Sequence, residues 1–291
     1  MRFIVNPKAG GSDRTAEVTA AVREVLGSEN GMFEINVAAG SDSLSRLSAE
    51  AVRKGYDAVF ACGGDGTVNH VAAPLVAAST ALGIIRLGSG NALAETLGIP
   101  EGVRECVSLV KRFSVREIDA GTICGRYFFT TAGLGFEAHL SKRYNTESWS
   151  SRMRGLRPYF PLAVMEFFRY RCTPSHIRAD GFSAEVAPFL LTAANIERLG
   201  GEAFIAPGAS PDDGLLDLCF VPRIGLLKSL GLGARLFSKR IEGFPGYTRM
   251  RVKEAEITRM GTHAVHVDGE AFDWTGPIEI GVKPKSLRIL V

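Results

Sequence analysis

The sequence lacks the features of a membrane-spanning or secreted protein. No apolar run in the 291 residues approaches the ~20 that a transmembrane helix needs. Residues 2–6 already have the pattern of a strand, so we expect no signal peptide ahead of the fold. The five cysteines are scattered and form no Cys-x-x-Cys pair, which excludes the common zinc and redox motifs. We therefore expect a cytoplasmic protein whose cysteines are small buried side chains.

Several well-known nucleotide signatures are absent as well. There is no Gly-x-x-x-x-Gly-Lys-Ser/Thr loop, and the His-Arg-Asp and Asp-Phe-Gly strings of protein kinases are missing. No Gly-x-Gly-x-x-Gly follows the first strand, which disfavours a dinucleotide oxidoreductase. The net charge of +3 is too small to indicate nucleic acid, and no nucleic-acid-binding motif is found. We therefore expect no nucleic-acid partner.

The first 114 residues alternate between strand and helix patterns. With 46% hydrophobic residues the chain can build a sizeable core. Alternation of this kind predicts an α/β domain with an open, mostly parallel sheet and helices on both faces. The expected strands are 3–5, 33–39, 58–62 and 82–87, and the expected helices are 14–26, 43–54, a stretch from 67, one opened by 88–91 and 101–112.

The pattern changes near residue 114, after which alternation with a period of two takes over. Asp180-Gly181 and Asp268-Gly269 each lie between two alternating stretches, which is typical of tight hairpins. Helical stretches are expected near 151–170 and 224–239. We therefore predict a second, mainly antiparallel β domain over residues 115–291, with its last strand returning to the first domain.

A glycine-rich loop at residues 63–67, Gly-Gly-Asp-Gly-Thr, lies between a buried strand and the start of a helix. Ligands of open α/β sheets bind beyond the carboxyl ends of the strands, and the N–H groups of a helix start attract phosphate. Asp65 would be repelled by phosphate unless it holds a cation or takes a proton from a hydroxyl, as phosphoryl transfer requires. The alternative is a tight turn in which Asp65 caps the helix.

Two further loops have the same character. Residues 88–91, Gly-Ser-Gly-Asn, again follow a strand and precede a helix. Ser89 could contact a phosphate, and Asn91 could orient a ligand or cap the helix. Residues 6–11 follow the first strand and include Lys8, a candidate phosphate partner, although the segment alone is only a glycine turn. All three loops should lie on one edge of the sheet and form a shared phosphate site.

The second half contains two acidic turns. Residues 207–217 place three carboxylates in one turn, which could hold Mg²⁺ or Ca²⁺ or could simply be solvated. Residues 268–270, Asp-Gly-Glu, form a hairpin turn in which Glu270 could be an ordinary exposed glutamate.

In this order, these strings resemble the diacylglycerol kinase and sphingosine kinase superfamily of lipid kinases over nearly the whole chain. The resemblance implies an α/β nucleotide-binding domain of the NAD kinase and phosphofructokinase type, followed by an antiparallel β-sandwich. The matching strings lie at 6–10, 63–67, 88–94, 133–136, 205–207, 212–217 and 268–270.

The resemblance implies roles for individual residues. Glu270 or Asp65 would be the proton acceptor, and the residues alone leave that choice open. Mg²⁺ would be held by the Asp213 carboxylate with the carbonyls of Ser210 and Leu215. The resemblance implies ATP contacts at residues 63–69 and at Ser89. With the loops at 6–11 and 88–91 included, the expected ATP contacts are Asn6, Lys8, Gly63, Gly64, Asp65, Gly66, Thr67, Val68, Asn69, Ser89, Gly90 and Asn91.

Three positions depart from the family pattern. His70 stands where the family usually has glutamate, and Ala92 stands where diacylglycerol kinases tend to have aspartate. The loop at 88–91 is more similar to that of sphingosine kinases, which suggests a sphingoid or ceramide-like acceptor as an alternative to diacylglycerol. Pro74 falls in the helix after the loop at 63–67, where we expect it to remove a hydrogen bond and bend the helix.

Residues 139–178 form a basic segment with interleaved aromatic side chains. Eight basic minus two acidic residues give this segment a charge of +6. That composition suits contact with anionic lipid, and the alternative is an amphipathic helix packed on the second domain. A second basic stretch, 228–240, is weaker. We therefore expect a protein peripheral to the inner face of the membrane.

The sequence favours an ATP-dependent lipid kinase. One alternative is a kinase of a soluble substrate such as NAD, because NAD kinases and phosphofructokinases share a similar Gly-Gly-Asp-Gly element. The other is a nucleotide- or lipid-binding protein without catalysis, motivated by His70 and Ala92. The sequence leaves open whether the protein is a monomer or a homodimer.

Overall fold

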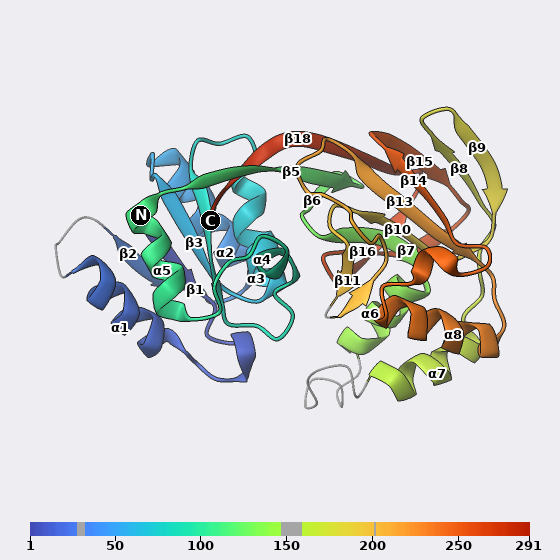
Figure 1. The fold of residues 1–291 in the computed structure, drawn as a ribbon, viewed down its shortest axis with the longest axis horizontal. Helices are drawn as coiled ribbons and strands as arrows, with labels where there is room; N and C mark the ends of the chain where they lie inside the picture. Colours follow the sequence, from blue (N-terminus) through green and yellow to red (C-terminus); the bar gives the residue numbers. More distant parts are fainter. Residues whose placement is uncertain (28–32, 147–158, 201) are drawn as a thin grey trace. The chain divides into compact units, whose positions relative to one another are not determined.

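The computed structural model describes residues 1–27, 33–146, 159–200 and 202–291. The chain forms two compact units (Figure 1). Unit 1 contains residues 1–120 and 284–291, and unit 2 contains residues 121–283. Among the described residues, no helix combines the length and the apolar character needed to cross a membrane.

Unit 1 is built on a parallel sheet, as predicted. The order of its strands is β2-β1-β3-β4-β18, and both β3 and β4 are buried along almost their whole length. Strands buried on both faces read as continuous apolar runs, which is the pattern of Ala-Val-Phe-Ala-Cys at the start of β3. The strands are β1 (Arg2–Val5), β2 (Glu34–Val37), β3 (Ala58–Gly63), β4 (Ala81–Arg86) and β18 (Ile278–Leu290).

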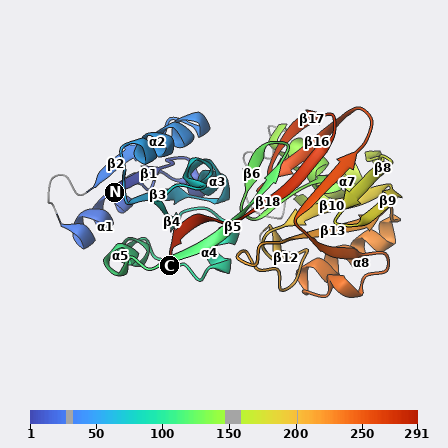
Figure 2. The ribbon, with the colours of Figure 1, turned by 90° about the horizontal axis from the view of Figure 1, so that it is seen from above.

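The helices of unit 1 cover both faces of this sheet. Helices α1 and α5 pack together, as do α2 and α3, and Figure 2 shows α2 on one side of the strands with α1 and α5 on the other. Helix α3 ends at Ala72, and a separate 3₁₀ turn, η2, carries Pro74. The expected bend is therefore wrong: the helix stops before the proline. The bounds are α1 (Thr15–Leu26), α2 (Ser41–Arg53), α3 (Asp65–Ala72), α4 (Ala92–Thr96), α5 (Val103–Arg112), η1 (Ala9–Gly11) and η2 (Ala73–Leu75).

Two strands carry the chain between the units. β5 (Val115–Ile123) leaves unit 1, and β18 begins in unit 2 and ends in unit 1, where Ile289 is the partner of Leu82 in β4. Within unit 2, β18 pairs antiparallel with β15.

Unit 2 is an antiparallel β-sandwich, which confirms the predicted class. One sheet has the order β14-β13-β10-β7-β16-β17, and the other continues from β18 through β15 and β8 to β9. The core between them joins Leu134, Leu191 and Leu218 of the first sheet to Ile177 and Ile257 of the second. The strands are β6 (Arg126–Phe128), β7 (Thr131–Gly135), β8 (Ser175–Ala179), β9 (Phe182–Val186), β10 (Pro188–Ala194), β11 (Arg198–Gly200), β12 (Ala203–Phe204), β13 (Leu216–Pro222), β14 (Thr248–Val252), β15 (Glu254–Thr258), β16 (Thr262–Val267) and β17 (Glu270–Thr275).

Both predicted Asp-Gly hairpins are confirmed. Ala179 pairs with Phe182 across Asp180-Gly181, and Val267 pairs with Glu270 across Asp268-Gly269. Each turn has positive φ at both central residues, 32° and 84° in the first and 46° and 87° in the second. This is the two-residue geometry that matches the twist of the flanking strands.

Three helices accompany the sandwich: α6 (Phe136–Thr146), α7 (Tyr159–Arg169) and α8 (Leu226–Phe237). Together with one face of the first sheet they form a second core, which includes Phe136, Leu162, Phe189 and Leu232. Helix α8 and residues 159–169 of the predicted helical stretches are confirmed, whereas residues 151–158 lie outside the described part. Helix α6 was not predicted, because its sequence is mostly polar, although Phe136, Ala138, Leu140 and Ser141 are buried in the structure.

Candidate active site

The three predicted loops follow β1, β3 and β4, which run parallel and therefore end at the same edge of the sheet. The structure brings the loops into direct contact. The Asn6 side-chain amide donates a 2.9 Å hydrogen bond to the Thr67 hydroxyl, which ties the first loop to the second. A Cβ at Gly10 would lie 2.2 Å from the Leu87 carbonyl oxygen, so the first loop also approaches the third. Only glycine fits that position.

The second and third loops touch through their glycines. A Cβ at Gly88 would lie 2.4 Å from the Cα of Gly64, and a Cβ at Gly90 would lie 2.4 Å from an Asp65 carboxylate oxygen. Neither separation leaves room for a side chain. Gly88 is therefore required by close packing of two backbones, whereas at Gly90 the obstacle is the Asp65 side chain.

Asp65 caps a helix, although not its own. Gly64 is the N-cap of α3 and makes no side-chain capping bond. Instead, the Asp65 Oδ1 atom accepts a 2.8 Å hydrogen bond from the backbone N–H of Ala92, the first residue of α4. The carboxylate of one loop thus stabilises the N-terminus of the helix that follows the next loop.

The start of α3 presents backbone N–H groups at the same edge. The bond from the Val68 N–H to the Gly64 carbonyl, 3.0 Å long, is the one that closes the first turn. The N–H groups of residues 65–67 precede this turn, which is the arrangement that binds phosphate at helix N-termini. Val68 itself is buried, and its N–H is occupied within the helix. Of the expected contacts, Gly63 and Thr67 are buried as well.

The polar side chains of the first and third loops differ in exposure. Lys8 and Ser89 are exposed, as a group that reaches a soluble ligand must be. Asn91 adopts the left-handed conformation with φ of 54°, and its side-chain amide donates a 2.7 Å hydrogen bond to the Gly88 carbonyl. Asn91 therefore fixes the shape of its own loop. The sequence analysis allowed Asn91 to cap the helix, but at the N-cap of α4 its side chain makes no capping hydrogen bond.

Glu270 belongs to unit 2, where it is the exposed first residue of β17. The neighbouring Asp268 holds the hairpin in place. Its carboxylate accepts hydrogen bonds from the backbone N–H groups of Phe129, Thr130 and Thr131 and from the Thr130 hydroxyl. Sequence reasoning assigned no role to Asp268, whose position before a glycine in a tight turn indicated only the turn.

In the acidic turn before β13, residues 207–217, Asp213 is the carboxylate that is expected to bind a cation. Asp213 forms an ion pair with Arg251, and its Oδ1 accepts a 3.1 Å hydrogen bond from the Leu215 N–H. The Ser210 hydroxyl donates a 2.7 Å hydrogen bond to Asp212. Within the described ranges, no cluster of three or more His, Cys, Asp and Glu side chains could hold a metal ion. One carboxylate with backbone carbonyls and water is nevertheless a donor set that Mg²⁺ accepts. The donors fit Mg²⁺, with Arg251 as a competitor for the carboxylate.

A cavity of about 550 Å³ lies within unit 2, between helices α6, α7 and α8 and strand β10. Its volume is that of a small-molecule site, and its wall is almost entirely apolar. Leucine and phenylalanine side chains dominate the lining, including Phe136, Leu140, Phe167, Phe189, Leu230 and Phe237.

Among the described residues, Glu137 is the one carboxyl group that lines this cavity. Its Oε1 accepts a 2.8 Å hydrogen bond from the Thr192 hydroxyl, whereas its Oε2 is buried with no hydrogen-bond partner. Burial raises the pKa of Glu137 to about 8, so the group is mostly protonated at neutral pH. Glu137 follows the Gly-Leu-Gly-Phe string, but nothing in the sequence alone marked it as unusual.

The positive charge of the basic segment, residues 139–178, is partly neutralised by an acidic residue of the same segment. Arg143 and Arg169 both form ion pairs with the buried Glu166, which also contacts His139 at 2.7 Å. Burial acts to raise the pKa of Glu166, but the hydrogen bonds from His139 and Arg169 outweigh it and leave the pKa lowered. Three of the eight basic residues, at 152, 154 and 157, lie outside the described residues.

Comparison with known proteins places this geometry in a family. The sequence model of the diacylglycerol kinase catalytic domain matches residues 1–123, and that of the YegS C-terminal NAD kinase beta sandwich-like domain matches residues 130–291. The chain belongs to the diacylglycerol kinase and YegS-like lipid kinase family. It is therefore a kinase, that is, a phosphotransferase.

Full-length relatives support this assignment. The chain is 29% identical to a diacylglycerol kinase of Mycobacterium tuberculosis, over 99% of this chain and 93% of the relative. It is 28% identical to a protein of Pseudomonas aeruginosa named "Probable lipid kinase YegS-like", over 99% of this chain and 92% of the relative.

Solved structures show the same fold. A diacylglycerol kinase from Bacillus anthracis superposes with a TM-score of 0.74 at 22% identity, covering 99% of this chain and 95% of that one. An NAD kinase from Archaeoglobus fulgidus in complex with ATP gives a TM-score of 0.53 at 14% identity, covering 100% and 94%. At these identities the likeness concerns the fold alone.

Proposed function

We propose that this chain transfers the γ-phosphoryl group of ATP to a hydroxyl of a membrane lipid. The observation that carries the proposal is the contact between three loops at one edge of the unit 1 sheet, with α3 starting there. Phosphates of ATP, which enters as its Mg²⁺ complex, would lie against the N–H groups of residues 65–67 and within reach of Lys8 and Ser89. The ATP complex of the NAD kinase with the same fold supports the choice of nucleotide.

The two candidate acidic residues receive different roles in this proposal. Asp65 is held by the Ala92 N–H, so it is fixed in place and suited to orienting the acceptor hydroxyl or the metal ion of MgATP. Glu270 is exposed and would take the proton of the attacking hydroxyl. The transition state would be stabilised by fixed dipoles and charges around the transferred phosphoryl group, the largest contribution in most phosphoryl transfers.

The apolar cavity of unit 2 supports a lipid over a soluble acceptor. A chain of methylene groups gains free energy from each group that leaves water, whereas a dinucleotide would find almost no polar partners on this wall. Glu137, protonated near neutral pH, could share a hydrogen bond with an ester, amide or hydroxyl of the lipid. Diacylglycerol, sphingoid bases and ceramide-like lipids all satisfy this chemistry.

We further propose that Asp213, with the carbonyls of Ser210 and Leu215, holds a structural Mg²⁺ when Arg251 releases the carboxylate. Such an ion would stabilise the acidic turn and take no part in the transfer. Basic residues of the 139–178 segment and of α8 would keep the enzyme at the inner face of the membrane.

A substrate panel tests this function. The purified chain would be incubated with γ-labelled ATP and, separately, with a total lipid extract and with NAD. Label in the lipid fraction supports the proposal, and label in NAD alone would favour a soluble acceptor. ATP binding without transfer to either would indicate a binding protein.

A further inference from the structure

Helix α8 leaves an apolar stripe in water. Leu227, Leu230, Ala234 and Phe237 follow one another at spacings of three and four residues and therefore share one side of the helix. Leu227 is 84% exposed, Leu230 48% and Phe237 50%. The opposite side of α8 is buried through Leu232 and Leu236. Leu230, Ala234 and Phe237 also line the apolar cavity described above, whereas Leu227 does not. The stripe is not part of the buried core, and exposed apolar patches of this kind mark interaction surfaces.

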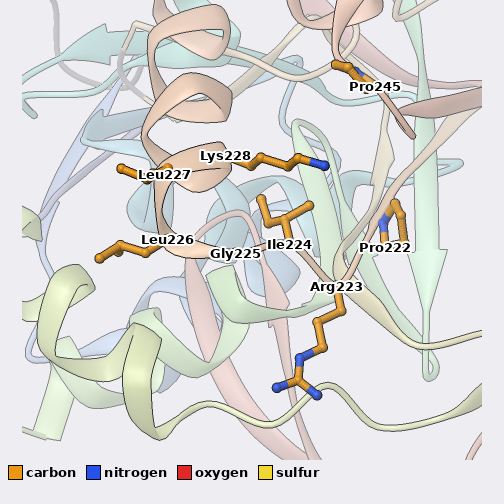
Figure 3. A pocket seen from close by; sticks show the side chains of 8 residues that line it. All are labelled: Pro222, Arg223, Ile224, Gly225, Leu226, Leu227, Lys228 and Pro245. Atoms are coloured by element: carbon orange, nitrogen blue, oxygen red, sulfur yellow. The ribbon is translucent and has the colours of Figure 1, made fainter.

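The flanks of the stripe carry charge of one sign. Residues 223–240 contain Arg223, Lys228, Arg235, Lys239 and Arg240 and no acidic residue. Lys239 forms an ion pair with Glu197, and for Arg223 and Lys228 the structure gives no ion pair with any described residue. These two cations line a pocket of about 440 Å³ at the start of α8 (Figure 3). In that view Leu226 and Leu227 extend from one side of the helix and Lys228 from the other.

Helix α7 also has exposed apolar side chains. It exposes Met165 and Phe168, by 41% and 64%, and both α7 and α8 line the apolar cavity described above. Two of the helices that line that cavity therefore also carry exposed apolar side chains. A cavity for hydrocarbon chains would then adjoin the surface that meets them.

We propose that α8 is the membrane-docking helix of this protein, with its apolar stripe in the interfacial layer and its cations on anionic headgroups. The inference rests on the proposed function and names the surface through which that site reaches its lipid. An apolar side flanked by lysine and arginine is the composition of interfacial helices. A second copy of the chain is disfavoured as the occupant, since a symmetric contact would bring two clusters of five basic residues together.

Vesicle flotation with the full chain tests the proposal. The wild-type protein is expected to bind vesicles of phosphatidylglycerol and phosphatidylcholine more tightly than pure phosphatidylcholine, with binding that weakens as salt is raised. Leu227→Glu should weaken partitioning about tenfold, because it places a charge in the apolar stripe. The matched control is Met260→Glu, since Met260 is 90% exposed and lies in the turn between β15 and β16, outside α8. That variant should bind as the wild type does.

The contributions of the charge and of the apolar stripe to vesicle binding can be measured separately. Arg223→Gln with Lys228→Gln should reduce binding to anionic vesicles and leave the weak binding to neutral vesicles unchanged. Wild-type protein that binds no anionic vesicle, or Leu227→Glu binding as tightly as Met260→Glu, would overturn the proposal. So would a dimer in sedimentation equilibrium that Leu227→Glu dissociates while vesicle binding stays intact.

Transfer to a dissolved lipid distinguishes this inference from the proposed function. With dioctanoylglycerol below its aggregation concentration, docking is not needed. Leu227→Glu should therefore phosphorylate it at the wild-type rate while losing vesicle binding. A wild-type chain that transfers nothing to any lipid would contradict the proposed function, and flotation would still decide the role of α8.

Discussion

The Asp65 carboxylate lies 2.8 Å from the backbone N–H of Ala92, so one loop of the candidate site holds the helix that follows another. Asp65 could therefore serve as a helix cap, as a residue of the phosphoryl transfer, or as both. If Asp65 were only a cap, any side chain that accepts the same hydrogen bond would replace it.

Substitutions of Asp65 separate capping from chemistry. Asp65→Asn keeps an acceptor oxygen for the Ala92 N–H, and we expect its melting temperature to stay close to that of the wild type. Asp65→Ala leaves that N–H without its partner and should cost about 1 kcal/mol of unfolding free energy. Thermal and denaturant unfolding measure both. Equal stability of the two variants would show that the Ala92 bond contributes nothing.

Gly88→Ala should damage unit 1 and the proposed nucleotide site together. The new Cβ would lie 2.4 Å from the Gly64 Cα, and backbone cannot move aside as a flexible side chain can. We expect a loss of about 1–3 kcal/mol in stability and much weaker ATP binding by calorimetry. Gly40→Ala in the same unit is the control, since its Cβ would meet nothing within 4 Å. Gly88→Ala with normal ATP affinity would contradict close packing of the two loops.

Glu137 should make the protein less stable as the pH rises. Burial raises its pKa from 4.5 to about 8, so between these values the native state keeps a proton that the unfolded state has released. Stability from this group is fully present below pH 4.5 and falls by about 1.4 kcal/mol per pH unit until pH 8. Glu137→Gln removes the titration and retains the shape. Urea unfolding of both proteins between pH 5 and pH 8 should show a difference that changes with pH, and a constant difference would contradict a buried neutral carboxyl.

Mg²⁺ and Arg251 should compete for Asp213. Mg²⁺ is expected to raise the unfolding midpoint of the wild type, and Arg251→Gln should bind the ion several-fold more tightly because the competing cation is gone. Asp213→Asn should abolish the stabilisation. Calorimetric titration and thermal unfolding in Mg²⁺, with Ca²⁺ for comparison, measure these effects. A midpoint that Mg²⁺ does not move in any variant would argue against a cation in this turn.

The parts of the fold that depend on local pattern were predictable from sequence. The parallel strands of unit 1 read as short apolar runs, and the two Asp-Gly turns specified their hairpins through the backbone conformation they require. The placement of the three glycine loops followed from chain direction, because β1, β3 and β4 all end at one edge.

Features that depend on tertiary packing were not predictable. Helix α6 is mostly polar in sequence, and its Phe136 and Leu140 are buried by packing against other elements, which no local pattern shows. Glu137 became unusual only when Phe189 and its neighbours excluded water around it. The capping bond from Asp65 to Ala92 joins residues 27 positions apart. Such contacts form only when loops that are distant in the sequence meet in the folded chain, so no local sequence pattern predicts them.

Transfer of label from γ-labelled ATP to a total lipid extract, by the wild type and by Asp65→Asn in parallel, tests the central claim most directly. We expect a labelled lipid with the wild type and a rate at least about 100-fold lower with Asp65→Asn, at unchanged thermal stability. Equal transfer by the two proteins, or label that appears in NAD and in no lipid, would contradict the account.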